Sequence, residues 1–217
     1  MPPDDAGLAR GVWTVVVAAG NGTRFGGPKQ FAMVGARRVL DWSLDTARAA
    51  SDGVVVVLPP DRAAAEGGVA GGSTRSESVR CGLRHVPDDA EIICVHDAAR
   101  PFASLHLFRA VVDAVRGGAD AAVPALPVAD TIKQVDGEGR VVATPDRASL
   151  VAVQTPQAFR ADVLRRAHAG SPEGTDDAAL VEASGGTVRT VPGERINRKL
   201  TEPDDLEWAR VAAGTEI

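Results

Sequence analysis

Short apolar runs rich in valine alternate along this chain with stretches of helical periodicity, and this alternation restricts the fold more than any other feature. The runs occupy residues 12–19, 54–58, 92–95 and 121–126. They are nearly continuous in hydrophobicity, as in strands that are covered on both faces. Between them, apolar residues recur at helical spacing, for example at Val79, Leu83 and Val86. Strand–helix–strand repetition predicts an α/β fold with a mostly parallel sheet and helices on both faces.

The segment from Asp130 to Val153 breaks this alternation. Its β-branched residues flank an Asp-Gly-Glu-Gly turn at residues 136–139, which indicates a β-hairpin, and no helical pattern accompanies it. Because an isolated hairpin is marginally stable in water, it must pack on its own domain or on another subunit. Further patterns predict helices over residues 161–167 and 175–183, a strand over 187–191 and a last helix from 203 to about 213.

Composition narrows the class of protein. A length of 217 residues suits one domain, and a net charge of −5 argues against a nucleic-acid partner. The longest apolar run is far shorter than the ~20 residues of a membrane span, and the first residues lack the basic start of a secretory signal. Cys81 and Cys94 are too few for a disulfide framework or a four-ligand zinc site. We therefore expect a cytoplasmic protein with no nucleic-acid or membrane partner.

A glycine-rich segment, AAGNGTRFGGPKQF at residues 18–31, follows the first apolar run. In open parallel sheets, ligands bind beyond the carboxyl ends of the strands. Glycines let a backbone approach a ligand closely, and free N–H groups in such a loop can form an anion nest. Arg24 and Lys29 add two cations, and Lys29 is one of only three lysines beside 21 arginines. The segment suits a triphosphate; the alternative is a glycine-rich turn with solvated charges.

Two familiar phosphate-binding motifs do not fit this segment. Phe25 stands where the dinucleotide-binding fingerprint needs its third glycine. The stretch from Gly22 to Lys29 resembles a P-loop, but Pro28 intrudes and Gln30 replaces the hydroxyl residue that would hold magnesium. Both motifs can therefore be excluded for this loop.

A carboxylate, Asp97, ends another apolar run, in the segment VHDAARPF. There it would face the ligand crevice and could hold Mg²⁺ together with water, with Arg100 close enough to contact phosphate. The alternatives are that Asp97 caps the helix that starts near Ser104, or that it pairs with Arg100. His96 is expected to be part of the packing.

Other polar segments follow predicted strands. The stretch from Gly71 to Ser78 precedes a helix whose N-terminus could present N–H groups to a base or sugar; the alternative is that Ser73 or Thr74 only caps the helix. Three more segments have local alternatives as a turn, an N-cap and a solvated basic turn. They are Thr155-Pro156-Gln157, Thr175-Asp176-Asp177 and Asn197-Arg198-Lys199-Leu200-Thr201. The four histidines show no metal-binding spacing.

Taken in order, these segments resemble the 2-C-methyl-D-erythritol 4-phosphate cytidylyltransferase family of the non-mevalonate isoprenoid pathway. The matching pieces are AAGNGTRFGGPKQF, GG…R-x-x-SV, VHDAARPF, PVADTIK, TPQAF, TDDAALVEASG and NRKLTEPDDL, spanning residues 12–208. The resemblance implies a Rossmann-like single domain over residues 12–217 with a protruding β-arm, about 126–152, that forms a homodimer. Residues 1–11 match nothing and are expected to be mobile. Because the chain ends at Ile217, we expect no fused cyclase domain.

The implied reaction joins CTP to methylerythritol phosphate and releases pyrophosphate. Such chemistry needs charge neutralisation and positioning. The resemblance makes Arg24, Lys29, Lys199 and Arg147 catalytic and Asp97 the ligand of Mg²⁺ or another divalent cation. It assigns the nucleotide to Ala18, Ala19, Gly20, Gly22, Arg24, Lys29, Gly71, Gly72, Ser78, Asp97 and Ala98. It assigns the polyol phosphate to Asp97, Arg100, Thr131, Arg147, Thr155, Thr175, Asp176 and Lys199, with Thr131 and Arg147 reaching the partner subunit's site.

Two alternatives remain on the sequence alone. D-ribitol-5-phosphate cytidylyltransferases share the glycine loop, the HDA-x-RP pattern and the chemistry, and differ mainly in the acceptor pocket. A non-catalytic nucleotide-binding protein could use the same fold, although such a protein would be expected to lose Arg24, Lys29, Asp97 or Lys199. A sugar-phosphate or molybdopterin nucleotidyltransferase would leave TPQAF and TDDA unexplained. Arg198 departs from the apolar residue that the family more often has.

Overall fold

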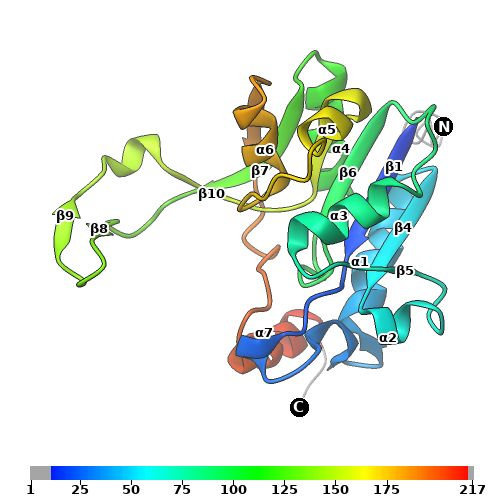
Figure 1. The fold of residues 1–217 in the computed structure, drawn as a ribbon. Coiled ribbons are helices and arrows are strands. Elements are labelled where there is room, and N and C mark those ends of the chain that lie inside the picture. The colour runs from blue at the N-terminus through cyan, green and yellow to red at the C-terminus, as the bar shows by residue number, and fades with distance from the viewer. Residues whose placement is uncertain (1–10, 215–217) are drawn as a thin grey trace, which may run out of the picture.

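A single mixed sheet forms the centre of the molecule (Figure 1). The computed structural model describes residues 11–214, and within them the sheet has eight strands. They are β1 (Val12–Val17), β4 (Gly53–Leu58), β5 (Val69–Ala70), β6 (Ile92–Asp97), β7 (Ala121–Pro127), β10 (Val151–Val153), β11 (Gln157–Arg160) and β12 (Val188–Pro192).

The strands next to the glycine-rich segment and the VHDAARPF segment are parallel neighbours. β5, β4, β1 and β6 run parallel in that order, with Val17 of β1 beside Asp97 of β6. β11 lies antiparallel between β6 and β7, β10 pairs antiparallel with the outer part of β7, and β12 runs parallel to β7. The predicted mostly parallel sheet is confirmed, and its antiparallel members are β10 and β11.

Helices cover both faces of the sheet, as the sequence predicts. One face carries α1 (Val39–Ala50), α2 (Pro60–Ala63) and α4 (Leu105–Arg116); the other carries α3 (Arg75–Leu83), α5 (Ala161–Ala167) and α6 (Asp177–Ala183). The first face packs around Leu40 and Phe108 and the second around Val79 and Leu164, all of them buried. Two buried cores therefore hold the sheet rigid beneath the loops at its carboxyl end.

A third, smaller core holds the last helix, α7 (Pro203–Ala212), at one end of the sheet. Leu200 and Ala209 pack there on Val34 and Val39, next to the short hairpin of β2 (Met33–Val34) and β3 (Arg37–Arg38). Single 3₁₀ turns lie at η1 (Thr23–Phe25), η2 (Lys29–Phe31) and η3 (Arg147–Ser149). Burial of Leu200 fixes the backbone next to Lys199.

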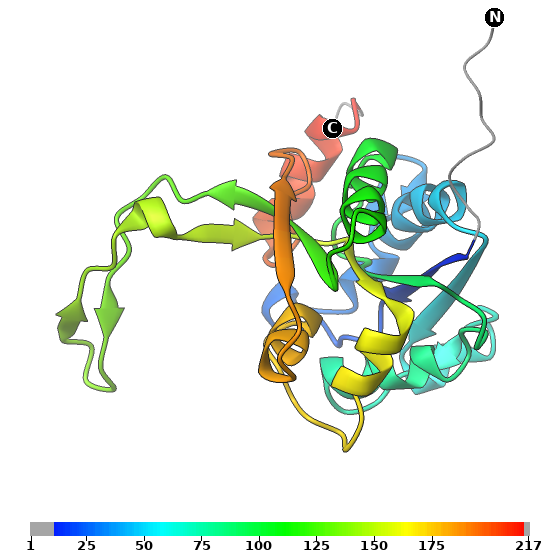
Figure 2. The ribbon, with the colours of Figure 1, turned by 90° about the horizontal axis from the view of Figure 1, so that it is seen from above.

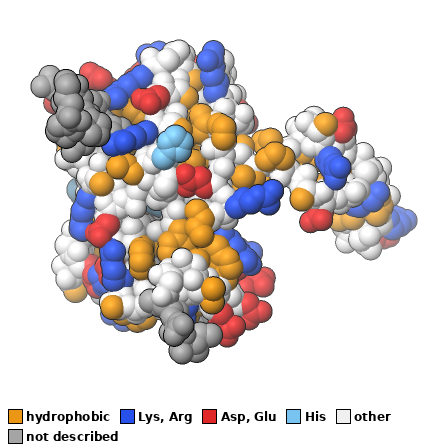
Figure 3. Space-filling view, turned by 180° about the vertical axis from the view of Figure 1, so that it is seen from behind, with side chains coloured by type: hydrophobic (Ala, Val, Ile, Leu, Met, Phe, Trp, Pro, Cys, Tyr) orange, Lys and Arg blue, Asp and Glu red, His pale blue; other side chains and the backbone are white. Residues whose placement is uncertain are grey.

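The segment predicted as a hairpin is an arm that projects from the body (Figures 1 and 2). Its tip pairs β8 (Gln134–Val135) with β9 (Val141–Ala143), and the outer end of β7 with β10 forms its base. Figure 3 shows it from behind as a narrow extension with apolar side chains on its surface. Six exposed apolar residues lie on the arm or its base: Ile132, Val135, Val141, Val142, Val151 and Val153. The hairpin is therefore confirmed, and it does not pack on its own domain.

The predicted mobile extension, residues 1–11, lies outside the described residues except for Gly11. The Gly11 amide donates to Asp52 Oδ2 at 2.6 Å, and its carbonyl accepts from the amides of Glu91 and Ile92. Within residues 11–214, no helix has both the length and the apolar character needed to cross a membrane.

Candidate active site

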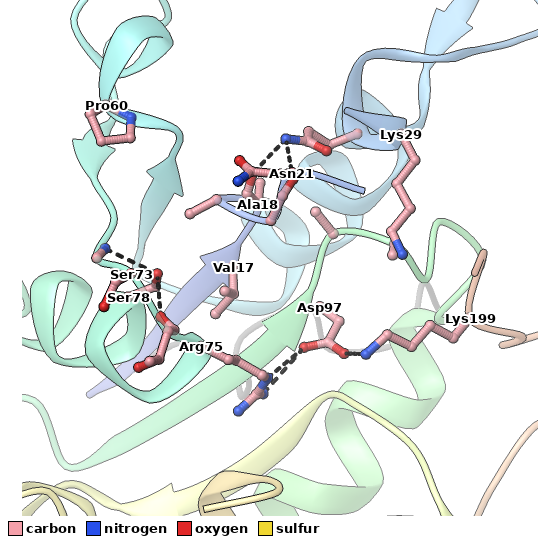
Figure 4. A pocket seen from close by; sticks show the side chains of 17 residues that line it. Val17, Ala18, Asn21, Lys29, Pro60, Ser73, Arg75, Ser78, Asp97 and Lys199 are labelled. Atoms are coloured by element: carbon pink, nitrogen blue, oxygen red, sulfur yellow. Dashed lines mark hydrogen bonds and ion pairs between the residues drawn. The ribbon is translucent and has the colours of Figure 1, made fainter. Parts of the chain in front are cut away.

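A cavity of about 370 Å³ opens where β1 and β6 end (Figure 4). Its wall comes from the glycine-rich loop, the start of α3, the end of β6 and the segment before α7. The lining residues are Val17, Ala18, Ala19, Gly20, Asn21, Lys29, Gln30, Pro60, Gly72, Ser73, Thr74, Arg75, Ser78, Asp97, Ala98, Ala99 and Lys199. Its position agrees with the rule that ligands bind at the carboxyl ends of parallel strands.

The glycine-rich loop is closed by its own backbone. The Gly22 carbonyl accepts from the amides of Phe25 and Gly27, and Gly22 itself has a φ of +62°. A Cβ at Gly22 would lie 1.8 Å from the Gly27 carbonyl oxygen, so any side chain there would open the loop.

Gln30 fastens the loop to the end of β1. Its side chain is buried, and Nε2 donates to the carbonyl oxygens of Ala18 at 2.8 Å and Gly20 at 3.2 Å. On the sequence alone, Gln30 only argues against a P-loop. The structure shows why an amide stands there: two carbonyl groups need a donor that a serine or threonine could not bring to both.

Asp97 is the one carboxylate among the lining residues, and two cations hold it. Oδ1 accepts from Nε and Nη2 of Arg75, both at 3.2 Å, and Oδ2 accepts from Nζ of Lys199 at 2.6 Å. Burial alone would raise the pKa of Asp97, but Arg75 and Lys199 hold that pKa well below its usual range. The carboxylate therefore stays ionised at neutral pH.

Both alternatives for Asp97 are wrong. The N-cap of α4 is Ser104, whose hydroxyl accepts from the Leu107 amide. Arg100 donates instead to the carbonyl oxygens of Asn197 at 2.8 Å and Val153 at 3.4 Å. Arg100 was predicted to bind the acceptor phosphate; in this structure it ties the segment before Lys199 to the base of the arm.

A second hydrogen-bond chain fixes the backbone of Asp97. Its amide donates to Oγ1 of Thr155 at 3.0 Å, Oγ1 lies 3.1 Å from Nδ1 of His96, and Nε2 of His96 lies 3.2 Å from the Arg100 carbonyl oxygen. Because a carbonyl only accepts, Nε2 carries the proton and Nδ1 accepts from Thr155. Burial lowers the pKa of His96 to about 4, so the ring is neutral at pH 7. His96 packs against Phe108, as expected, and Thr155 positions Asp97.

Lys29 and Lys199 approach Asp97 from the opposite side to Arg75 (Figure 4). Partial burial lowers the pKa of Lys29, and the nearby charge of Lys199 lowers it further. Two lysines on one side of a single carboxylate leave an excess of positive charge in the cavity. Such a surplus suits a polyanion.

The start of α3 forms the opposite wall. Thr74 is its N-cap, with Oγ1 accepting from the Glu77 amide at 3.0 Å, so the capping alternative is correct for this residue. Oγ of Ser78 accepts from the Gly72 amide at 3.1 Å and donates to the Thr74 carbonyl. A Cβ on Gly71 would lie 2.4 Å from Cβ of Ala19, so glycine permits the close approach of the two walls.

The structure brings nine of the predicted site residues into the cavity wall. These are Ala18, Ala19, Gly20, Lys29, Gly72, Ser78, Asp97, Ala98 and Lys199. Six more lie outside the wall on the body of the domain: Gly22, Arg24, Gly71, Arg100, Thr155 and Thr175. Asp176, also outside it, is the N-cap of α6 and accepts from the Gln157 amide group at 2.7 Å.

The arm, which carries the predicted residues Thr131 and Arg147, projects away from the body of its own chain (Figures 1 and 2). Thr131 is exposed, and Arg147 donates to the Ala129 carbonyl at 2.8 Å within the arm. Sequence reasoning named the segments that contain Arg75 and Asp177 but gave neither residue a role, although both form ion pairs at the site. The usable signal for Arg75 was its place as the one charged residue between the glycine pair and the predicted helix.

The cavity suits a divalent cation that arrives with a phosphate. No group of three or more histidine, cysteine or acidic side chains placed to hold a metal exists within residues 11–214. Mg²⁺ is commonly bound by one or two carboxylates together with substrate phosphates and water. Asp97 alone therefore fits a metal that is shared with a nucleotide and does not fit a cage made only of protein ligands.

Comparison with known proteins points to one family. The family model for 2-C-methyl-D-erythritol 4-phosphate cytidylyltransferase matches residues 12–214. The enzyme of that name from Nocardia farcinica is 43% identical over 95% of both chains. The bifunctional IspD/IspF enzyme of Solidesulfovibrio magneticus is also 43% identical, and the match covers 95% of this chain and 58% of that relative's length. The crystal structure of the Thermus thermophilus enzyme, 37% identical, superposes with a TM-score of 0.80 over 93% of this chain and 98% of its own.

Proposed function

The chain belongs to the family of 2-C-methyl-D-erythritol 4-phosphate cytidylyltransferases and is a cytidylyltransferase, and we propose that the cavity at the ends of β1 and β6 is its active site. There it transfers the cytidylyl group of CTP to 2-C-methyl-D-erythritol 4-phosphate and releases pyrophosphate. The observation that carries this assignment is the meeting of Asp97, Lys29 and Lys199 beneath a glycine-rich loop.

The chain's own residues position charge. The loop from Ala19 to Gly22 presents backbone N–H groups to the triphosphate, and Lys29 and Arg24 neutralise negative charge as it builds on the α-phosphoryl group and the departing pyrophosphate. Lys199 serves the reacting phosphates. The opposite wall at Gly72 and Ser78 holds the cytidine, since backbone groups and a hydroxyl line it.

Asp97, the one carboxylate among the lining residues, would hold the divalent cation, Mg²⁺ or another. When bound, the cation supplies further neutralisation of the phosphate oxygens. Lys199 Nζ lies 2.6 Å from Oδ2 of Asp97, so a cation held by Asp97 would weaken this ion pair, and Lys199 would then be available to contact phosphate.

The arm would complete the acceptor pocket of a second copy of the chain in a homodimer. Its exposed valines and Ile132 have no cover within residues 11–214, and burying them against another copy would stabilise an arm that cannot be stable alone. Thr131 and Arg147 would reach the partner's acceptor phosphate. Free, buried Cys81 and Cys94 agree with the cytoplasmic location that we also propose.

The deciding experiment measures pyrophosphate release from CTP and Mg²⁺ with 2-C-methyl-D-erythritol 4-phosphate and, in parallel, with D-ribitol 5-phosphate. Turnover of the first acceptor alone is expected. Turnover of the second alone would keep the chemistry and reassign the acceptor. Binding of CTP without turnover of either would contradict the assignment as an active site.

A further inference from the structure

A buried chain of charges runs from the cavity into the opposite core. Arg75, the first residue of α3, donates through Nε and Nη2 to Oδ1 of Asp97 and through Nη1 to Oδ2 of Asp177 at 2.7 Å. The other oxygen of Asp177 lies 3.0 Å from Nε2 of His168. The Asp177 side chain has no exposed surface and that of His168 is 3% exposed. Segments far apart in sequence thus meet through one guanidinium group.

The two oxygens of Asp97 have different kinds of partner. Oδ1 is held by the planar fork of Arg75, whose side chain is 25% exposed, whereas Oδ2 is held by the single ammonium of Lys199, which is 40% exposed. Nε and Nη2 of Arg75 converge on the same oxygen and fix its position, while a lysine is a point charge on a flexible stem. The Arg75 contact therefore holds Oδ1 in place, and the Lys199 contact can open without moving it.

Asp177 prevents Arg75 from turning into the cavity. If Arg75 moved toward a phosphate, Asp177 would lose its arginine partner, and a buried negative charge that is not compensated is strongly unfavourable. His168 fixes the second oxygen of Asp177, so the carboxylate cannot rotate to follow. Although Arg75 lines the cavity, its guanidinium group is already paired with the carboxylates of Asp97 and Asp177.

We propose that Arg75, locked from behind by Asp177 and His168, is a positioning residue that holds Oδ1 of Asp97 so that Oδ2 can exchange Lys199 for a phosphate-bound divalent cation. This inference rests on the proposed function of the site. It assigns to the Arg75–Asp177 pair a role in metal and nucleotide geometry that a purely structural ion pair would not have.

The test compares Asp177→Asn and Arg75→Lys with Arg80→Gln. Arg80 is a matched control because it lies on the same helix, does not line the cavity, and pairs with Glu173 and the Pro172 carbonyl and with neither Asp97 nor Asp177. Dissociation of Mn²⁺ is followed by its EPR signal with CTP present and no acceptor, and kcat, KM for CTP and thermal unfolding are measured on the same samples.

Asp177→Asn and Arg75→Lys are expected to weaken Mn²⁺ binding in the CTP complex by about 10–100-fold and to lower kcat by a similar factor, because partners of metal ligands usually contribute that much. Arg75→Lys should retain more activity than Arg75→Gln, since it keeps the charge. Arg80→Gln should change stability alone. The proposal is overturned if Asp177→Asn and Arg75→Lys stay folded and bind Mn²⁺ as the wild type does.

The two levels of inference fail differently. Wild-type protein that binds Mn²⁺ with CTP but turns over no acceptor would remove the proposed function, and the comparison of variants would still decide the role of Arg75. If Arg75→Gln does not fold, Asp177→Asn, which keeps the size of the side chain and a carbonyl acceptor for Arg75, supplies the answer.

Discussion

Replacing Gln30 by methionine tests whether a single side chain holds the glycine-rich loop in its binding shape. Methionine has about the volume of glutamine but no donor, so the hydrogen bonds from Nε2 to the carbonyl oxygens of Ala18 and Gly20 are lost. Gly20 is exposed, and water can replace its partner. Ala18 is 4% exposed, so its carbonyl would lose its partner in a buried place.

The magnitude follows from that difference. A buried polar group without a partner costs about 1–3 kcal/mol, while an exposed one costs little. We expect Gln30→Met to lower the free energy of unfolding by about 2 kcal/mol, which for a chain of this size lowers the Tm by about 4–8 °C. The loop then samples other shapes, and if about 1.4 kcal/mol of the loss falls on the binding conformation, KM for CTP rises about tenfold.

Urea unfolding and initial rates at varied CTP measure the two effects separately. Thr14→Val is the control, because Thr14 is fully buried and its hydroxyl pairs with Ser51 at 2.6 Å, away from the cavity wall. It should lower stability and leave KM for CTP unchanged. A Gln30→Met enzyme that is destabilised but keeps the wild-type KM for CTP would refute the link between Gln30 and the loop.

Three further predictions concern single side chains of the site and the arm. Lys29→Met should lower kcat by several orders of magnitude, yet raise the unfolding midpoint at pH 7. Burial lowers the pKa of Lys29, which means that folding disfavours the charged form and that removing the charge stabilises the fold. This gain in stability should shrink as the pH approaches 10.5, the ordinary pKa of lysine, and urea titrations at several pH values would check it. Gly22→Ala should raise KM for CTP with little change at saturating CTP, because the added Cβ would lie 1.8 Å from the Gly27 oxygen; an unchanged KM would show that the loop binds CTP in another shape. Arg147→Ala subunits, inactive alone, should regain part of their activity when allowed to exchange with Lys29→Ala subunits, and no recovery despite demonstrated exchange would count against an acceptor site shared between subunits.

Local patterns predicted the elements well where burial is continuous. The Val-rich runs became β1, β4, β6 and β7 because a strand covered on both faces must be apolar throughout its length. The turn at Asp136 and Gly139 formed as predicted, with the Gly139 amide donating to the Asp136 carbonyl. The antiparallel direction of β11 was not predicted, because strand direction depends on the path of the arm and leaves no mark on a four-residue run.

Residue chemistry in the loops was predicted less evenly. Lys29 and Asp97 could be selected from the sequence because each follows a predicted strand. Lys199 could be selected because the resemblance to the cytidylyltransferase family gives it a role. Thr155 was assigned to substrate, whereas its hydroxyl is used between the Asp97 amide and His96. Hydroxyl groups serve ligands and backbone equally well, so their type alone does not distinguish the two uses.

The sequence by itself determined the alternation of strands and helices, the hairpin that no helix covers, and the segments that supply cations to one edge of the sheet. Periodicity and turn residues are local properties, and each can be seen in a window of a few residues. Only the tertiary structure decided which charges pair: Arg75 meets Asp97 and Asp177 across separations of 22 and 102 residues. Such pairs form because the fold buries these carboxylates side by side, and a buried charge requires a partner from whichever segment the packing brings near.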